Sequence, residues 1–284
     1  MVAGDGAAPT VALFVTCVVD LVRPDVAVAA VRLLRDTGAS VSCPKGQTCC
    51  GQPAWNAGFT DEAAAVAAAS LAALEADPAD HIVVPAGSCA TMIRRYWPQL
   101  FALAGRPDDA ERAERLAPRV VELSELLALA DPPPPVAADH DGHDRSDPGP
   151  GTQPSPDEGT VAYHRSCHLE RELHVVDQPV ALLARATGQP PVPWRADDRC
   201  CGFGGTFSVR LPEVSVAMAD DKLDTLPKGV DTVVGCDTSC LLHLEARARE
   251  RGLGLRFVHL AEILAEAATR PGPPSSPDAG NDHG

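Results

Sequence analysis

Cysteine is the residue type in this chain most able to do chemistry, and it occurs in a repeated pattern. Two adjacent pairs are each followed by glycine, in the sequences Cys49-Cys50-Gly51 and Cys200-Cys201-Gly202. Each pair has one distant cysteine upstream and one downstream. The resulting sets of four are Cys17, Cys49, Cys50 and Cys89, and then Cys167, Cys200, Cys201 and Cys240.

The spacing within the two sets agrees closely. The upstream cysteine precedes its pair by 32 residues in the first set and by 33 in the second. In both sets, 39 residues separate the second member of the pair from the downstream cysteine. Gly38 and Gly188 each lie 21 residues after the first cysteine of their set. Such self-similarity indicates a duplicated structural unit.

Four thiolates per set are the number and type of ligand that a [4Fe-4S] cluster requires. Soft sulfur ligands select iron–sulfur clusters, zinc or copper(I) over hard cations. Zinc sites usually contain short Cys-x2-4-Cys knuckles, whereas here the close pair is directly adjacent and the other cysteines are distant. The spacing therefore favours one or two [4Fe-4S] clusters, with structural zinc as the alternative.

Two further alternatives concern the thiols themselves. A disulfide framework is disfavoured if the protein works in a reducing compartment. A nucleophilic cysteine would need a nearby base, and His164 and His168 flank Cys167, whereas Phe14 and Val18 occupy the matching positions in the first half. We expect three side chains either to tune the second site or receive a partner, or to be purely structural: His164, His168 and Arg171.

Two cysteines lie outside the repeat. Cys43 is the last residue of an expected strand and is interpreted as a small buried apolar residue. Cys236 aligns with Pro85 of the first half. It could be a spare ligand or a resolving thiol, and we favour neither role.

The elements that position the first set follow from apolar runs and helical periodicity. Strands are predicted over 11–15, 39–43 and 81–84. Helices are predicted from Pro24 to a stop at Gly38, and over 61–75, 92–103, 108–116 and 122–130, with Thr60 capping the second of them.

The second half repeats this order. Strands are predicted over 160–164, 191–194, 232–235 and 255–258, and helices over 178–187, 212–226, from Cys240 to Arg251, and over 261–269. The alternation predicts an α/β fold of two pseudo-repeated lobes with small parallel sheets. The cysteine loops are expected at the carboxyl ends of the strands.

The composition divides the chain into four segments. We expect cysteine-rich domains over 9–130 and 160–269, joined by a disordered proline-rich linker over 131–159 and followed by a disordered tail over 270–284. His140 and His143 lie in the linker, where a stray metal site is possible but a solvated spacer fits the composition better.

Charge and hydropathy exclude several function classes. A formal net charge of -15 and an aromatic content of 4% argue against nucleic-acid binding. No segment approaches the roughly 20 apolar residues of a membrane helix, and residues 1–9 do not resemble a signal peptide. We therefore expect a cytoplasmic protein with reduced thiols.

The motifs also carry a family resemblance. The duplicated Cys…Cys-Cys-Gly…Cys pattern resembles the cysteine-rich CCG domain of the B component of heterodisulfide reductase and of the iron–sulfur subunits of glycolate oxidase and anaerobic glycerol-3-phosphate dehydrogenase. The segments GQTCCGQPAWNAG, PAGSCATM, CHLERELHV, CCGFGGTFSVRLPEVSVAMADDK and DTSCLLHL resemble the lactate-utilisation protein A family more specifically. The likeness covers about 11–264, without the proposed linker.

That resemblance implies a cytoplasmic protein that acts with two partners, the lactate-utilisation proteins B and C, in the oxidation of L-lactate to pyruvate. It carries the family's ligand positions onto the eight repeated cysteines. The heterodisulfide reductase pattern ends each motif with Cys-x-x-Cys, but Cys89 and Cys240 have no cysteine three residues away. This departure favours conventional four-cysteine sites over a five-cysteine noncubane cluster.

The sequence thus predicts an iron–sulfur electron-transfer subunit of an L-lactate oxidation complex. Such a chain would be a non-catalytic or co-catalytic subunit of an oxidoreductase. The alternatives are a cluster- or thiol-based reductase that acts directly on a small substrate, with His164 or His168 as proton donor, and a structural zinc scaffold.

Overall fold

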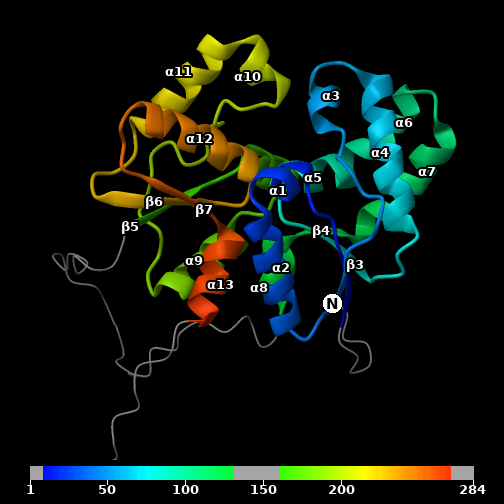
Figure 1. Ribbon diagram of the computed structural model, residues 1–284, viewed down its shortest axis with the longest axis horizontal. Coiled ribbons are helices and arrows are strands. Elements are labelled where there is room, and N and C mark those ends of the chain that lie inside the picture. Colours follow the sequence, from blue (N-terminus) through cyan, green and yellow to red (C-terminus); the bar gives the residue numbers. More distant parts are fainter. Residues whose placement is uncertain (1–8, 131–159, 270–284) are drawn as a thin grey trace, which may run out of the picture.

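The computed structural model of this protein describes residues 9–130 and 160–269, and it confirms an α/β fold with two small parallel sheets (Figure 1). The predicted linker, with His140 and His143, and the predicted tail lie outside the described residues.

The first sheet has the strand order β2-β1-β3-β4, with every neighbouring pair parallel. Its strands are β1 (Thr10–Leu13), β2 (Ser40–Ser42), β3 (His81–Val84) and β4 (Val120–Glu122). Val11 pairs with Val41 on one side and His81 on the other. Parallel strands place all their carboxyl ends at one edge, where the loops after β1 and β3 carry cysteines.

Helices follow each strand of this half. They are α1 (Cys17–Val22), α2 (Pro24–Asp36), α3 (Gln52–Asn56), α4 (Thr60–Glu75), α5 (Gly87–Thr91), the π-helical turn η1 (Met92–Tyr96), α6 (Trp97–Leu103), α7 (Pro107–Leu116), the 3₁₀ turn η2 (Ala117–Arg119) and α8 (Leu123–Leu129). Gly38 has a φ of 86° just after α2, as expected for a helix stop.

The second sheet has the order β5-β6-β7 and is also parallel. Its strands are β5 (Thr160–His164), β6 (Val230–Gly235) and β7 (Arg256–His259). Its helices are η3 (His168–Glu172, a π-helical turn), α9 (Asp177–Thr187), α10 (Thr206–Arg210), α11 (Pro212–Leu223), α12 (Thr238–Glu250) and α13 (Leu260–Thr269).

Two local predictions were wrong, and one strand was not predicted. Residues 191–194, which the structure describes, form no strand. Val192 N–H donates to the Val161 carbonyl at 2.8 Å, but Pro191 and Pro193 have no N–H with which to continue the pairing. The predicted helix over 122–130 is preceded by a strand, β4, because β-branched Val120 and Val121 pair with β3. Thr60 is the first residue of α4 rather than its cap.

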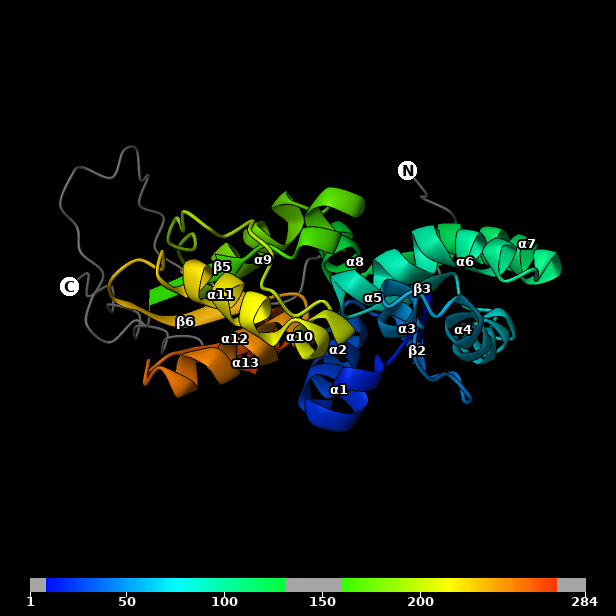
Figure 2. The ribbon, with the colours of Figure 1, turned by 90° about the horizontal axis from the view of Figure 1, so that it is seen from above.

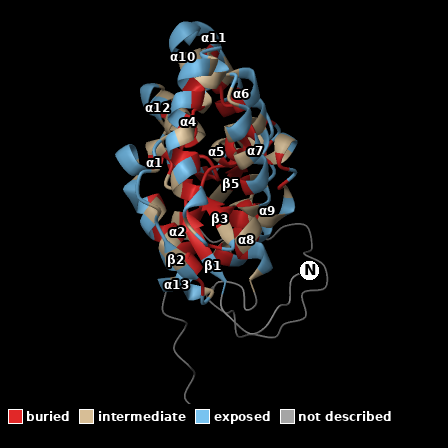
Figure 3. Cartoon of the chain, turned by 90° about the vertical axis from the view of Figure 1, so that its right-hand side faces the viewer, coloured by how far each residue is buried: buried red, intermediate tan, exposed pale blue. Residues whose placement is uncertain are grey.

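The larger hydrophobic core draws on both halves of the chain. It contains Leu13 and Leu33 from the first half and Leu183 and Leu264 from the second. Helix α13 packs on α2 and α9, and α8 packs on α9, so these helices join the two sheets (Figures 1 and 2). The buried residues follow the strands and the inner faces of the helices (Figure 3). The shared core fixes the cysteine loops of one half relative to those of the other.

Candidate metal centre

The first set of cysteines, called nest 1 (Cys17, Cys49, Cys50 and Cys89), gathers where short helices begin. Cys17 is the first residue of α1, and Cys89 lies in α5. The adjacent pair immediately precedes Gly51 and α3. Backbone N–H groups at helix starts lack partners within the helix, so they favour negatively charged sulfur.

Nest 1 is held together by sulfur–sulfur contacts between residues far apart in the sequence. Cys17 Sγ lies 3.5 Å from Cys49 Sγ, and Cys50 Sγ lies 3.3 Å from Cys89 Sγ. The Gly51 N–H donates to Cys49 Sγ at 3.4 Å. The hydrogen bonds from Cys17 and Cys50 lower the pKa of Cys49 to about 3, which makes it the thiolate of the group.

The second set, called nest 2 (Cys167, Cys200, Cys201 and Cys240), has the same construction. Cys201 Sγ lies 3.0 Å from Cys240 Sγ, and the Gly202 N–H donates to Cys200 Sγ at 3.4 Å. Hydrogen bonds from Cys167 and then Cys201 hold the pKa of Cys200 well below that of a free thiol. Cys200 therefore corresponds to Cys49 in chemistry as well as in sequence.

The glycine after each pair is required by the backbone. Gly51 has a φ of 85°, and a Cβ there would lie 2.8 Å from the Ala63 carbonyl oxygen. Gly202 has a φ of 91°, and its Cβ would lie 2.6 Å from the Ser215 carbonyl oxygen. A side chain at either position would combine a left-handed conformation with a backbone clash. These glycines let each cysteine loop pack directly on its helix, α4 or α11.

The spread of the sulfur atoms is wider than a single zinc ion needs. Among the described residues, only one group of three Cys, His, Asp or Glu ligand atoms lies with all its members within 4.8 Å of one another, and it consists of His164, Cys201 and Cys240. In a tetrahedral site with Zn–S bonds of about 2.3 Å, all four sulfurs lie about 3.8 Å apart. The eight cysteines therefore fit a larger metal group better than two mononuclear zinc ions.

Both nests line one cavity of about 330 Å³ between the two halves. Its wall is partly apolar, with Val18, Phe203 and Val209, and partly polar, with Gln52 and His168. The sequence predicted one nest in each half but did not indicate that the two would face the same space.

Hydrogen bonds beside the cavity join the halves. The Ser88 N–H donates to Asp237 Oδ2 at 2.9 Å, and the Gly87 N–H donates to the Cys236 carbonyl at 3.2 Å. A Cβ at Gly87 would lie 2.7 Å from Leu169 Cβ, so glycine allows α5 to approach η3. Helix α5, which contains Cys89, is therefore in direct contact with η3, which begins immediately after Cys167.

The three polar residues expected near nest 2 have different surroundings. His168 lines the cavity, with its Nδ1 at 3.7 Å from Cys167 Sγ and its Nε2 at 3.3 Å from Gln52 Nε2. His164 is buried, and burial followed by the charge of Lys222 lowers its pKa to about 3, so the imidazole is neutral. Arg171 donates to the Asp198 carbonyl at 2.9 Å and supports a loop.

Lys222 was not identified from the sequence, because a lysine in an amphipathic helix is normally solvated. Its side chain is fully buried, with Nζ 4.5 Å from the Trp194 ring centroid. The ammonium donates to three backbone carbonyls of the loop before Cys200: those of Ala196, Asp197 and Arg199. In the first half, Ser70 binds the backbone of the cysteine loop in the way that Lys222 does in the second half. Its Oγ accepts from Thr48 N–H at 2.9 Å and donates to the Cys49 carbonyl at 3.3 Å.

The two cysteines outside the repeat differ from each other. Cys236 is buried, with its Sγ 3.3 Å from the Tyr163 hydroxyl. Cys43 was predicted to be buried, and this was wrong: it is exposed, and it lies just after the end of the short edge strand β2.

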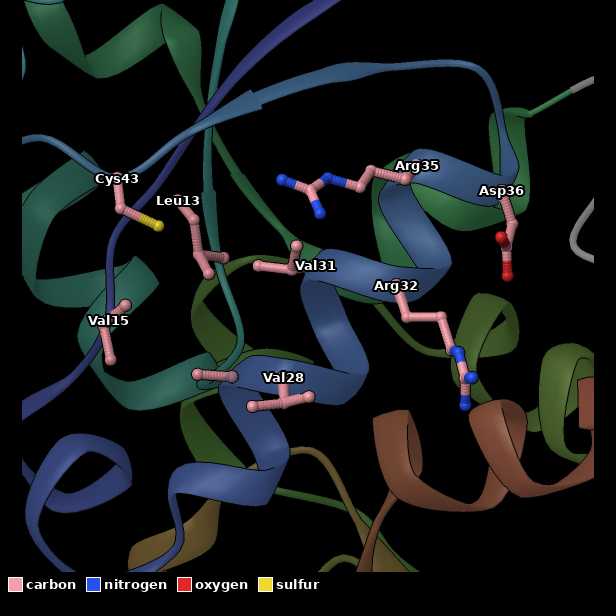
Figure 4. Close-up of a pocket in the computed structure, with 9 residues that line it drawn as sticks. Leu13, Val15, Val28, Val31, Arg32, Arg35, Asp36 and Cys43 are labelled. Atoms are coloured by element: carbon pink, nitrogen blue, oxygen red, sulfur yellow. The ribbon is translucent and has the colours of Figure 1, made fainter.

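Cys43 borders a separate hollow of about 440 Å³ between α2 and the first sheet (Figure 4). Leu13, Val15, Val28 and Val31 give the hollow an aliphatic lining, and Arg35 extends toward Cys43. One thiol, one carboxylate and two guanidiniums among aliphatic groups do not form a metal-ligand set.

Comparison with known proteins agrees with this architecture. The family model described as "CCG: Cysteine-rich domain" matches the chain twice, over 11–94 and 161–245. A protein of Exiguobacterium sp. named "Lactate utilization protein A" is 39% identical over 259 residues, which cover 91% of this chain and 98% of that protein. The protein of the same name from Geobacillus kaustophilus is 38% identical over 255 residues, or 89% of this chain and 98% of its own length.

The chain belongs to the lactate utilization protein A family. The family resemblance drawn from the cysteine motifs is thereby confirmed. The two CCG matches include all eight repeated cysteines of this chain, four in each match. Within residues 9–130 and 160–269, no helix is both long enough and apolar enough to cross a membrane.

Proposed function

We propose that this chain is the iron–sulfur subunit of an L-lactate oxidation system in the cytoplasm, and that nests 1 and 2 each bind a [4Fe-4S] cluster through their four cysteines. The observation that carries this proposal is the convergence of eight matched thiols on one cavity. When bound, such clusters accept and release single electrons. The subunit would thus pass electrons taken from a 2-hydroxy acid dehydrogenase partner.

The residues around the thiols support this role. Each nest contains one cysteine with a lowered pKa, Cys49 in nest 1 and Cys200 in nest 2. A lowered pKa favours the thiolate, which is the form that ligates iron. Backbone N–H groups of Gly51, Gly202 and Phe203 donate to sulfur. Such hydrogen bonds to cluster sulfurs set reduction potential. Lys222 and Ser70 hold the two cysteine loops in place.

The proposed partners are the lactate-utilisation proteins B and C. The relatives' shared name places those relatives in lactate utilization, and nothing about the nests themselves indicates a site for lactate. We infer that lactate is oxidised on a partner and that this chain receives the electrons.

Anaerobic mixing of the iron-loaded chain with the lactate-utilisation proteins B and C and with L-lactate tests this role. The reduced-cluster signal in electron paramagnetic resonance (EPR) should appear only when lactate and the partners are both present. A chain that stays oxidised in the complete mixture, although dithionite reduces it, would refute the electron-transfer role.

A second candidate function is supported by the cavity itself. Its volume of about 330 Å³ is enough for a small substrate to lie between the nests, and His168 Nδ1 is 3.7 Å from Cys167 Sγ. In this alternative, the chain is a reductase that acts directly on that substrate. His168→Ala should then abolish turnover and leave the iron content intact, whereas unchanged turnover would exclude the alternative.

A further inference from the structure

His164 distinguishes nest 2 from nest 1. It is the last residue of β5 and has 1% of its surface exposed. Phe14 occupies the corresponding place three residues before Cys17 and is fully buried. The duplicated halves therefore have an imidazole in the second half at the position where the first half has a phenyl ring.

The imidazole of His164 makes no hydrogen bond of good geometry among the described residues. Neither Nδ1 nor Nε2 makes a hydrogen bond there, although both atoms are buried. A buried polar atom without a hydrogen bond lowers the stability of the folded protein, and this ring has two such atoms. It points to a ligand that completes the site.

The position of the ring indicates which ligand this is. One ring nitrogen and the sulfur atoms of Cys201 and Cys240 lie within 4.8 Å of one another. No hydrogen bond joins this nitrogen to either sulfur in the described structure. A metal atom bound by all three, with bonds of about 2.1 Å to nitrogen and about 2.3 Å to sulfur, would bring the nitrogen to roughly 3.6 Å from each sulfur in tetrahedral geometry, so binding needs only a small adjustment of the side chains.

We propose that His164 is a direct ligand of the metal group in nest 2, together with Cys201 and Cys240. This inference rests on the proposal that nest 2 binds a metal cluster, and it gives that cluster a nitrogen donor in place of one of the four thiolates, whereas nest 1 keeps all four. The two sites are then chemically different, with sulfur ligands alone in nest 1 and mixed nitrogen and sulfur ligands in nest 2.

The mixed ligand set gives the two sites different reduction potentials, so one of them is reduced before the other. A neutral imidazole in place of a thiolate removes negative charge from the site, and such replacement raises reduction potential in iron–sulfur proteins. The buried ammonium of Lys222 should also raise the reduction potential of nest 2, since its positive charge interacts with Cys201 and Cys240. Nest 2 should therefore be reduced first, and electrons that enter at nest 1 should end on nest 2.

Pulsed EPR on the full chain tests the proposal. The chain is reconstituted anaerobically with iron and sulfide, reduced, and prepared in two forms, with natural-abundance histidine and with ring-¹⁵N histidine. We expect a directly bonded nitrogen coupling that changes with the isotope. Absence of that coupling in a chain that holds reduced clusters would overturn the proposal.

Matched variants assign the nitrogen to a residue. His164→Phe copies the residue found at the same place in the first half, so the fold should accept it. We expect this variant to lose the nitrogen coupling and to lower the potential of nest 2, while the nest 1 signal persists as a check on folding. His168→Ala should retain the coupling, and its loss in that variant instead would assign the nitrogen to His168 and refute the proposal.

Failure of the proposed function would look different. If the chain binds no iron and sulfide, we would load it with cobalt(II) and record the same nitrogen coupling and the ligand-field spectrum. A cobalt site with a nitrogen that is lost in His164→Phe would support the His164 ligand without an iron–sulfur cluster. An all-sulfur cobalt spectrum in the unmodified chain, or no cobalt bound in nest 2, would refute it.

Discussion

At the scale of single residues, the sequence is most informative where backbone geometry leaves only one choice. The Cys-Cys-Gly motifs located the two cysteine loops, and the structure shows why Gly51 and Gly202 cannot carry a side chain. No sequence pattern indicated Lys222, whose role depends on three carbonyls from a loop 23 to 26 residues away. Contacts of that kind are set by packing between elements, and no local pattern records them.

Replacing Gly51 by alanine should disrupt nest 1. The new Cβ would be strained by a φ of 85° and would lie 2.8 Å from the Ala63 carbonyl oxygen. We expect a loss of stability well above the roughly 1–2 kcal/mol of left-handed strain alone, together with loss of metal from nest 1. Urea unfolding and iron analysis measure both.

Gly58 provides the matched control. Its φ of 83° gives alanine the same strain, but no atom lies within 4 Å of a Cβ built there. Gly58→Ala should therefore cost about 1–2 kcal/mol and retain the metal. Equal effects of the two substitutions would show that the contact between the loop and α4 is unimportant.

At the scale of elements, the strands and helices with strong periodicity were predicted well, and the errors have local physical causes. Strand β3 has the predicted bounds, whereas Pro191 and Pro193 prevented a strand at 191–194. Strand β4 was missed because its three residues are too few to show alternation, and they run directly into α8. Pairing with β3, which no local pattern reveals, decides its conformation.

Glu122, at the junction of β4 and α8, should make stability depend on pH. Its carboxylate accepts from the Ser124 N–H at 2.7 Å, but burial raises the pKa from 4.5 to about 8. Between these values the folded chain keeps a proton that the unfolded chain releases, so stability falls as pH rises.

Glu122→Gln should remove this dependence, because the amide oxygen can still accept from Ser124 without titrating. From pH 5.5 to 8, urea unfolding should show a decline in stability for the unmodified chain that exceeds the decline for the variant by on the order of 3 kcal/mol. Parallel pH profiles for the two proteins would contradict this assignment.

At the scale of the whole molecule, duplication predicted two similar α/β halves but not their joint cavity. The repeat could be recognised because the cysteine spacing is nearly the same in both halves. The placement of the halves depends on contacts such as α13 on α2 and Gly87 on Leu169, which link residues more than 80 positions apart. Those contacts bring the two nests to one cavity.

Because the larger core is shared, the halves should stay together when the chain is cut between them. A specific protease site introduced within 131–159 allows cleavage of the otherwise intact chain. We expect the two fragments to coelute in size-exclusion chromatography and to retain their metal. Separation of the fragments would contradict the shared core.

Leu264→Asp in the cleaved chain is the sharper form of this test, because Leu264 is buried in the shared core on α13. The charge should weaken the contact and release the fragments. Glu266→Ala, on the exposed side of the same helix, should leave them associated.

The central claim is that each nest binds its own iron–sulfur cluster, and an anaerobic count of iron and acid-labile sulfide tests it most directly. The unmodified chain should hold about eight of each, and the double variants Cys49→Ser/Cys50→Ser and Cys200→Ser/Cys201→Ser should each hold about half as much. Zinc in place of iron, or no metal in the reconstituted chain, would contradict the account.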